Sequence, residues 1–212
     1  WAFAAAETLS DRFCIATNGS INVTLSPQDL ISCGHVRTPP KYLLGCDGGV
    51  PEYAWKYMEQ TGISTDACIP FVNTTKEVCP IANATCDAKK FKVAAGTTRV
   101  LDGAVSAVQQ FMSDPAKGGP VQAVFYVYQD FFSYKSGVYK RTNMSQAPLG
   151  KHSVKIVGYG LDETTFENYW LAANSWGDRW GMDGYFKIAT GQCEIESEMV
   201  FGEPQRVSNL ER

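Results

Sequence analysis

The spacing of the apolar residues changes near Pro120, and this change constrains the fold more than any other feature of the chain. Before Pro120 the apolar residues recur every three to four positions, which is typical of helices that pack on a core. After it they form short runs rich in Val, Ile, Tyr and Phe, separated by Gly and Asp, which predicts short strands. Helices followed by strands indicate an α+β chain with two lobes and a boundary near residues 95–105.

Capping residues locate the expected elements more closely. Ser26 followed by Pro27 and Asp29 is the pattern of an N-cap, a first helical position and an acidic first turn, so a helix should begin there. Further helices are expected over residues 1–16, 51–61 and 104–112, and strands over 121–128, 137–140, 153–159, 168–173 and 184–188. Ala54, Trp55 and Met58 form the face of the 51–61 helix that should pack inward.

Composition narrows the class of protein. The 212 residues are 44% hydrophobic and 19% charged, which is typical of a globular chain that can bury a core. The net charge is −3 and no basic stripe stands out, so we expect no nucleic-acid partner. No apolar run approaches the roughly 20 residues that a membrane span needs.

Cysteines and glycosylation sequons indicate the compartment. The chain has seven cysteines, which favour disulfides formed in an oxidising compartment. It also has five N-x-[ST] sequons, which together favour the secretory route, although any one of them could be an unused surface asparagine. The candidate glycosylation sites are Asn18, Asn22, Asn73, Asn83 and Asn143.

Several short motifs follow one another in a characteristic order. They are Trp1-Ala2-Phe3, Cys46-Asp47-Gly48-Gly49, Gly119-Pro120-Val121, His152, Ala173-Asn174-Ser175-Trp176-Gly177, Trp180-Gly181 and Cys193-Glu194-Ile195-Glu196-Ser197-Glu198. In this order they resemble the papain family of cysteine peptidases, and most closely its cathepsin B branch, nearly from end to end. The resemblance implies a papain-like two-lobed fold, with a helical left lobe, an antiparallel β-barrel-like right lobe and the active site in the cleft between them. The expected division is a helical lobe over residues 1–98, a β-rich lobe over 99–202 and a segment, 203–212, that crosses back.

The same resemblance assigns catalytic roles. The nucleophilic cysteine would directly precede Trp1, at the start of the 1–16 helix, so we expect the chain to continue upstream. His152 would take the thiol proton and Asn174 would orient its ring, with Trp176 and Trp180 as supporting residues. The alternatives are a packed or surface histidine, an asparagine that forms a turn, and tryptophans that only fill the core.

Substrate-binding positions also follow from the resemblance. Gly48 and Gly49 match the strip on which a substrate strand pairs, although a plain turn is the alternative. The pocket for the second residue before the cut would include Val50, Pro51, Val124, Ser153 and Glu198. A carboxylate at its floor would accept Arg as well as apolar side chains, unless Glu198 is a surface ion-pair residue.

Three features depart from the cathepsin B pattern. The stretch from Cys68 to Cys86 lacks the histidines of the occluding loop, which predicts endopeptidase action without release of C-terminal dipeptides. Lys151 replaces the usual glycine before His152 and could lower the pKa of that imidazole. The stretch between Cys33 and Cys46 is enlarged and contains two prolines.

Disulfide pairing is expected by resemblance. Cys14 and Cys46 match cysteines that pair with upstream partners, and Cys193 matches a position that is usually unpaired. The remaining cysteines allow three pairings, of which Cys33–Cys79 with Cys68–Cys86 is favoured.

The sequence therefore predicts a cysteine endopeptidase that acts through a thiolate–imidazolium pair and an acyl-enzyme. It should need no cofactor and no metal, and should act as a monomer in a lysosomal, vacuolar or secreted setting. Expected partners are peptide or protein substrates, a propeptide, and cystatin-type or epoxide inhibitors. The alternatives are a catalytically inactive papain-fold protein that uses its cleft for binding or adhesion, and a glycosylated structural protein.

Overall fold

The computed structural model describes residues 1–34, 42–74, 79, 89–101, 103–142 and 144–206. The chain forms two compact units: unit 1 consists of Trp1–Arg99 and Val200–Arg212, and unit 2 of Val100–Met199. The chain leaves unit 1 within strand β1 (Arg99–Leu101) and returns to it within β7 (Met199–Phe201). In the described ranges, no helix has both the length and the apolar character needed to cross a membrane.

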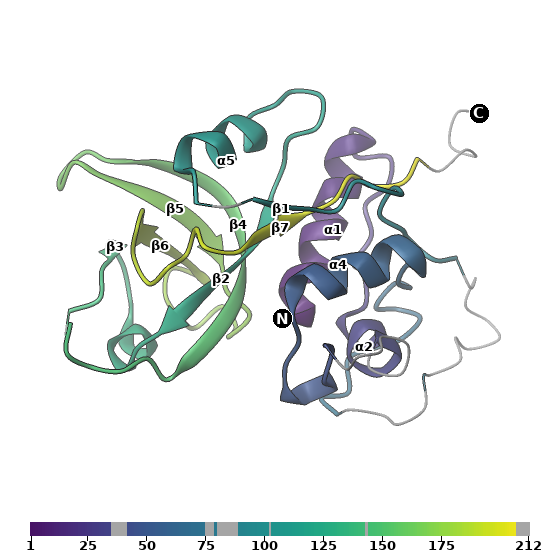
Figure 1. Ribbon diagram of the computed structural model, residues 1–212, viewed down its shortest axis with the longest axis horizontal. Coiled ribbons are helices and arrows are strands. Elements are labelled where there is room, and N and C mark those ends of the chain that lie inside the picture. Colours follow the sequence, from purple (N-terminus) through teal and green to yellow (C-terminus); the bar gives the residue numbers. More distant parts are fainter. Residues whose placement is uncertain (35–41, 75–78, 80–88, 102, 143, 207–212) are drawn as a thin grey trace. The chain divides into compact units, whose positions relative to one another are not determined.

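Helix α1 (Ala2–Ala16) lies in the core of unit 1 (Figure 1). Alanines on its buried face leave room for neighbouring side chains, and Leu9 and Phe13 on the same face are almost completely buried. The helix predicted over residues 1–16 is confirmed.

The predicted N-cap at Ser26 is also confirmed. Its hydroxyl accepts a hydrogen bond from the Asp29 amide at 3.0 Å, and Pro27 occupies the first helical position. Helix α2 (Pro27–Asp29) continues as the π-helical segment η1 (Leu30–Gly34).

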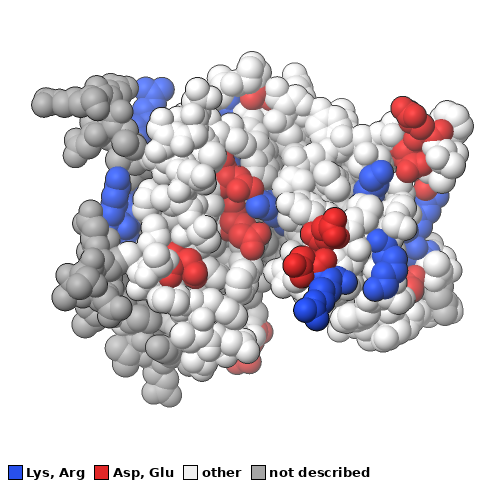
Figure 2. Space-filling model, turned by 180° about the vertical axis from the view of Figure 1, so that it is seen from behind, with Lys and Arg blue, Asp and Glu red and all other residues white. Residues whose placement is uncertain are grey.

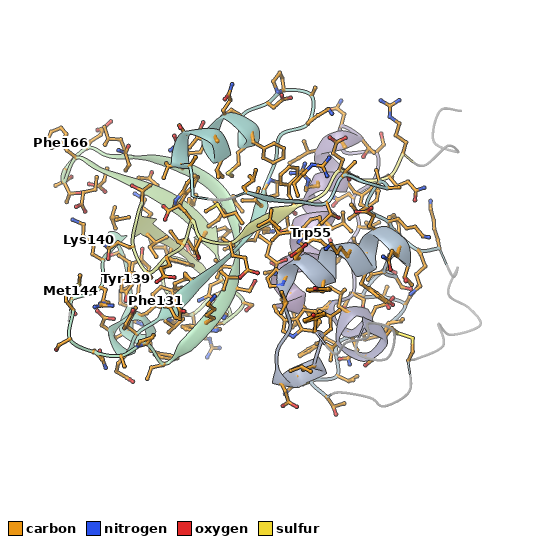
Figure 3. All side chains as sticks on the ribbon, in the orientation of Figure 1. Trp55, Phe131, Tyr139, Lys140, Met144 and Phe166 are labelled. Carbon is orange, nitrogen blue, oxygen red and sulfur yellow. A yellow bond between two sulfur atoms is a disulfide. The ribbon has the colours of Figure 1, made fainter. Side chains whose placement is uncertain are left out.

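Helix α4 (Pro51–Gln60) follows the 3-10 turn η2 (Gly45–Asp47) and buries the face that the sequence predicts. Ala54, Trp55 and Met58 expose no surface. Trp55 is labelled beside α4 in Figure 3, and it belongs to the same apolar cluster as the buried residues of α1.

Disulfides tie the loops of unit 1. Cys33 is bonded to Cys79, as predicted. Cys68 is also disulfide-bonded, and its expected partner, Cys86, lies outside the described residues. Cys193 is a free thiol among the described residues, as expected.

Three of the five candidate glycosylation sites are exposed, and two are not described. Asn18, Asn22 and Asn73 are exposed, whereas Asn83 and Asn143 lie outside the described residues.

Unit 2 is built on a sheet, and helix α5 (Val105–Met112) lies between its strands β1 and β2 in the chain. The strands of the seven-stranded sheet lie in the order β1-β7-β2-β4-β5-β6-β3 (Figure 1). Besides β1 and β7 they are β2 (Val121–Val127), β3 (Val138–Tyr139), β4 (Gly150–Asp162), β5 (Glu167–Ala173) and β6 (Tyr185–Ala189), and the 3-10 turn η3 (Gln129–Ser133) joins β2 to β3.

The mixed helix and sheet content expected for the chain is confirmed, and β2, β4, β5 and β6 pair antiparallel as expected, but the sheet is not barrel-like. The sheet is open, with β1 at one edge and β3 at the other. In addition, β3 pairs parallel to β6 through only two residues. Closure needs hydrogen bonds between the first and last strands, and strands of three and two residues give a short edge on each side.

Candidate active site

The sequence predicted a strand that begins just after His152, at residue 153. In the structure His152 lies inside the strand. Strand β4 begins at Gly150, and His152 is paired with Phe125 of β2 across the sheet. Because paired residues project from the same face of a sheet, their rings approach each other, with centroids 5.9 Å apart at 67°. The strand therefore fixes the position of the imidazole.

Asn174 directly follows β5 and is held by its backbone. Its amide donates a hydrogen bond to the Gly184 carbonyl at 2.9 Å. Its side-chain oxygen Oδ1 lies 2.8 Å from Nε2 of His152 and accepts a second hydrogen bond from the Ser175 amide, also at 2.8 Å. The structure thus brings together the two residues that were predicted as base and orienting group.

This arrangement determines where the imidazole carries its proton. The Ser175 amide can only donate, so the atom facing it must be the amide oxygen of Asn174. That oxygen can only accept, so Nε2 of His152 must donate. In the neutral imidazole Nδ1 is then the unprotonated nitrogen, and it is available to accept a proton.

Burial lowers the pKa of His152 below its ordinary value, and the hydrogen bond to Asn174 acts in the opposite direction. Lys151, which the sequence suggested as the cause, is not responsible. Its side chain projects from the other face of β4, where its ammonium lies 5.3 Å from the centroid of the Tyr126 ring.

Aromatic side chains surround the His152–Asn174 pair. The Trp176 ring lies 5.0 Å from the imidazole at 31°, and Trp180 packs edge-on against Trp176 at 5.1 Å. Sequence reasoning missed Phe132, whose ring stacks on Trp176 at 5.0 Å and 5° and whose carbonyl accepts the indole N–H of Trp180 at 3.1 Å. The paired Phe131-Phe132 after a predicted strand was the available signal.

Three predicted substrate-binding residues of unit 2 lie together. Val124 and Ser153 are partners in the β2–β4 ladder, and both are buried. The Val124 amide donates to the Glu198 carbonyl at 3.1 Å, and Glu198 itself is half-buried. Their role in binding a substrate stays a prediction.

The predicted residues of unit 1 lie directly before α4 and at its first position, Pro51. Gly48 has φ of +124°, a conformation that favours glycine. A Cβ at Gly49 would meet the Trp1 ring at 2.6 Å, so Gly49 is needed for packing whatever its role with substrate. Val50 is exposed and Pro51 is buried, and their substrate role is likewise untested.

Comparison with known proteins identifies the family. Residues 1–203 match the family described as papain family cysteine protease. The chain belongs to this family. Its relatives include the cathepsin B-like cysteine proteinase 4 of Caenorhabditis elegans, 38% identical over 97% of this chain, and the cathepsin B-like protease 1 of Arabidopsis thaliana, 40% identical over 96%. Among solved structures, proCathepsin B S9 from Trypanosoma congolense matches with a TM-score of 0.80 and 34% identity over 98% of this chain.

The papain-family chain is shorter than these relatives. It covers 67% of the Caenorhabditis protein, 55% of the Arabidopsis protein and 68% of the Trypanosoma chain. The match to the family nevertheless includes α1, His152 and Asn174, the parts on which the proposed chemistry depends.

Proposed function

We propose that this protein is a cysteine endopeptidase that hydrolyses peptide bonds through an acyl-enzyme. The observation that carries the proposal is the hydrogen bond between Nε2 of His152 and Oδ1 of Asn174, which leaves Nδ1 as the proton acceptor. Membership of the papain family supports the same chemistry.

The nucleophile in this proposal is a cysteine directly before Trp1. Trp1 is the N-cap of the 15-residue helix α1. The first backbone amides of a helix have no partner within the helix, so its N-terminus favours a negative charge. A thiolate is the reactive form of cysteine, so a positive helix terminus promotes the attack.

The reaction then proceeds in two steps. Nδ1 of His152 takes the thiol proton, and the sulfur attacks the peptide carbonyl carbon to form a tetrahedral intermediate. The C–N bond breaks as the imidazolium returns the proton to the leaving amine, which leaves a thioester. Water attacks the thioester while the imidazole accepts its proton, and the C–S bond breaks to release the acid and the thiol. Throughout, Asn174 holds the ring in one orientation.

Asn174 should also set the titration of His152. In protein with the residue before Trp1 replaced by alanine, we expect His152 to titrate below its ordinary value of about 6.5, and lower still in Asn174→Ala, because the hydrogen bond that favours the charged ring is lost. Because the pKa of His152 is lower in the folded state, the unfolded chain binds more protons at this residue. Its contribution to the free energy of unfolding is therefore fully present above about pH 6.5 and is lost as the pH falls toward the folded-state pKa. Proton NMR can follow the titration because the chain has two histidines. An unchanged His152 pKa in the variant would contradict the assigned role.

Glu198 is proposed to select Arg at the second residue before the cut. We expect Glu198→Gln to reduce kcat/KM for substrates with Arg at that position by roughly 10- to 100-fold relative to those with Phe, since a charge-assisted hydrogen bond contributes about 1.5–3 kcal/mol. The matched control is Glu194→Gln, because Glu194 is an exposed carboxylate of the same segment. Equal Arg-to-Phe ratios in the two variants would remove Glu198 from the pocket.

Endopeptidase action, without removal of C-terminal dipeptides, is part of the proposal. It is supported by the absence of histidine between Cys68 and Cys86 in the sequence. We expect a peptide to be cut internally at the same rate whether its C-terminus is a carboxylate or an amide. Mass spectrometry of the products tests this, and dipeptide release at rates matching internal cleavage would overturn it.

The setting and partners are proposed on related grounds. The Cys33–Cys79 disulfide and the exposed sequon asparagines support a lysosomal, vacuolar or secreted protein. The similarity to proCathepsin B S9 supports synthesis with a propeptide.

A further inference from the structure

Phe132, which the sequence did not single out, is the exposed member of the aromatic group around His152. Half of its surface (50%) is exposed, whereas Phe131, its neighbour in η3 and labelled in Figure 3, exposes none. The Phe132 ring is therefore not needed to fill the core of unit 2. Its contacts with the site can be separated from the stability of the fold, because exposed positions tolerate substitution.

The contacts of Phe132 lead to both tryptophans beside the imidazole. Its ring lies parallel to that of Trp176, at 5.0 Å and 5°, and the Trp176 ring lies 5.0 Å from the His152 imidazole at 31°. The Phe132 carbonyl accepts the indole N–H of Trp180 at 3.1 Å, and Trp180 meets Trp176 edge-on. Phe132 thus restrains Trp176 directly through its ring and indirectly through its carbonyl.

The turn that carries Phe132 is fixed by polar anchors. The carboxylate of Asp130 accepts a hydrogen bond from the Tyr139 hydroxyl at 2.7 Å. It also accepts two from Thr142, from the amide at 2.9 Å and from the hydroxyl at 2.7 Å. These bonds tie η3 to β3 and to the segment that follows it, so the Phe132 ring is presented by an ordered element.

The pair beneath Trp176 is sensitive to water. Nδ2 of Asn174 exposes less than 1 Å² of surface and has no hydrogen-bond partner among the described residues. Water that reached this buried donor would gain a favourable hydrogen bond, so the pair stays dry only while its cover is closed. Water would also compete with His152 for Oδ1 of Asn174, and the imidazole would lose its single orientation.

We propose that Phe132 is a positioning residue for His152: by holding Trp176 against the imidazole, it keeps water from the hydrogen bond between His152 Nε2 and Asn174 Oδ1. The consequence for catalysis rests on the proposed function. The consequence for the hydrogen bond does not, because that bond forms without the nucleophile.

A change of charge does not enter into this effect. The chain has a net charge of −3, and on the face seen in Figure 2 charged groups of both signs lie in small clusters separated by uncharged surface. Replacing Phe132 with another neutral residue alters none of these charges. Any change at His152 in such a variant would therefore report packing and access of water.

Solvent exchange of the His152 Nε2 proton tests the proposal directly. It can be followed by NMR of the whole protein with isotope-labelled histidine and with the residue before Trp1 replaced by alanine, since the chain has only two histidines. We expect exchange to be roughly tenfold faster or more in Phe132→Ala, because protection falls when a local opening admits water.

A conservative variant isolates the ring. Phe132→Tyr keeps a flat ring that can stack on Trp176, so exchange should stay within about twofold of the wild type. Both variants retain the backbone carbonyl at this position and therefore its hydrogen bond from Trp180. The comparison then measures the stacking contact alone.

Kinetics of the active protein supply the second readout. Phe132→Ala should lower kcat about tenfold and leave KM nearly unchanged, because a poorly oriented base slows the chemical step and not substrate binding. The matched control is Phe166→Ala, at an exposed phenylalanine of the same unit, which should change neither constant. All three variants should unfold at nearly the same temperature as the wild type.

Three results would overturn the proposal: wild-type exchange of the Nε2 proton in Phe132→Ala, equal exchange rates in Phe132→Ala and Phe132→Tyr, or a kinetic loss confined to KM, which would make Phe132 a substrate contact. Faster exchange in Phe132→Ala of a protein that lacks peptidase activity would contradict the proposed function while supporting the role of Phe132 at the His152–Asn174 pair.

Discussion

Replacing His152 with alanine should reduce kcat/KM by roughly 10²–10⁴-fold or more, since positioned general acid–base catalysis typically contributes that much. The imidazole takes the thiol proton and later returns it to the leaving amine, and no other described side chain hydrogen-bonds to Asn174 Oδ1 in its place. Steady-state cleavage of a dye-labelled peptide measures the loss. The loss should appear mainly in kcat, because the ring acts on the reacting atoms and not on substrate binding.

A matched variant on the other face of the same strand provides the control. Lys151 directly precedes His152, but its side chain packs on Tyr126. Lys151→Ala should therefore change kcat by much less than His152→Ala. If His152→Ala kept more than about a tenth of the wild-type kcat/KM, the assignment of the base would be wrong.

Phe131→Ala should be the most destabilising single change near the site, at about 3–5 kcal/mol. Phe131 exposes no surface and lies at the centre of the aromatic cluster of unit 2. Its ring contacts those of Phe125, Tyr139, Trp176, Trp180 and Phe186 at centroid distances of 4.9–5.5 Å. Figure 3 shows it beside Tyr139. Removal would leave a cavity beneath Trp176 and so loosen the cover of the imidazole.

Phe166 supplies the control for this substitution. It is also labelled in Figure 3, at the β4–β5 turn, and 78% of its surface is exposed. Phe166→Ala should change stability by less than about 0.5 kcal/mol, since exposed positions away from such packing are tolerant. Thermal and denaturant unfolding of both variants measures the difference. Equal effects would show that the cluster does not stabilise unit 2.

Local signals in the sequence were sufficient for the helices. Ser26, Pro27 and Asp29 form a cap within four residues, and the small residues of α1 permit the packing that makes it a core helix. The apolar face of α4 followed from helical spacing alone. These features depend on neighbours in the chain, so no knowledge of the tertiary structure was needed.

The sheet was less predictable because its ends depend on distant residues. Strand β4 starts at Gly150 because Gly150 pairs with Val127, a partner that no local pattern reveals. The short edge strands β1, β3 and β7 have two or three residues each and give almost no periodic signal. The open sheet follows from these edges, whereas the expected barrel-like lobe came from resemblance.

The site was predictable in its residues but not in its geometry. The ordered motifs around His152 and Asn174 identified both residues, and their hydrogen bond depends on a bulge-containing β4–β5 pairing that no spacing rule gives. The stacking of Phe132 on Trp176 was missed because η3 interrupts the strand pattern.

The most direct test of the central claim is labelling of the whole folded protein with a thiol-directed epoxide, followed by peptide-level mass spectrometry. We predict a covalent adduct on a cysteine directly before Trp1, formed rapidly in the wild type and much more slowly in His152→Ala. A different residue at that position, or a cysteine that stays unlabelled in folded protein, would contradict a peptidase and favour a binding role for this papain-family chain.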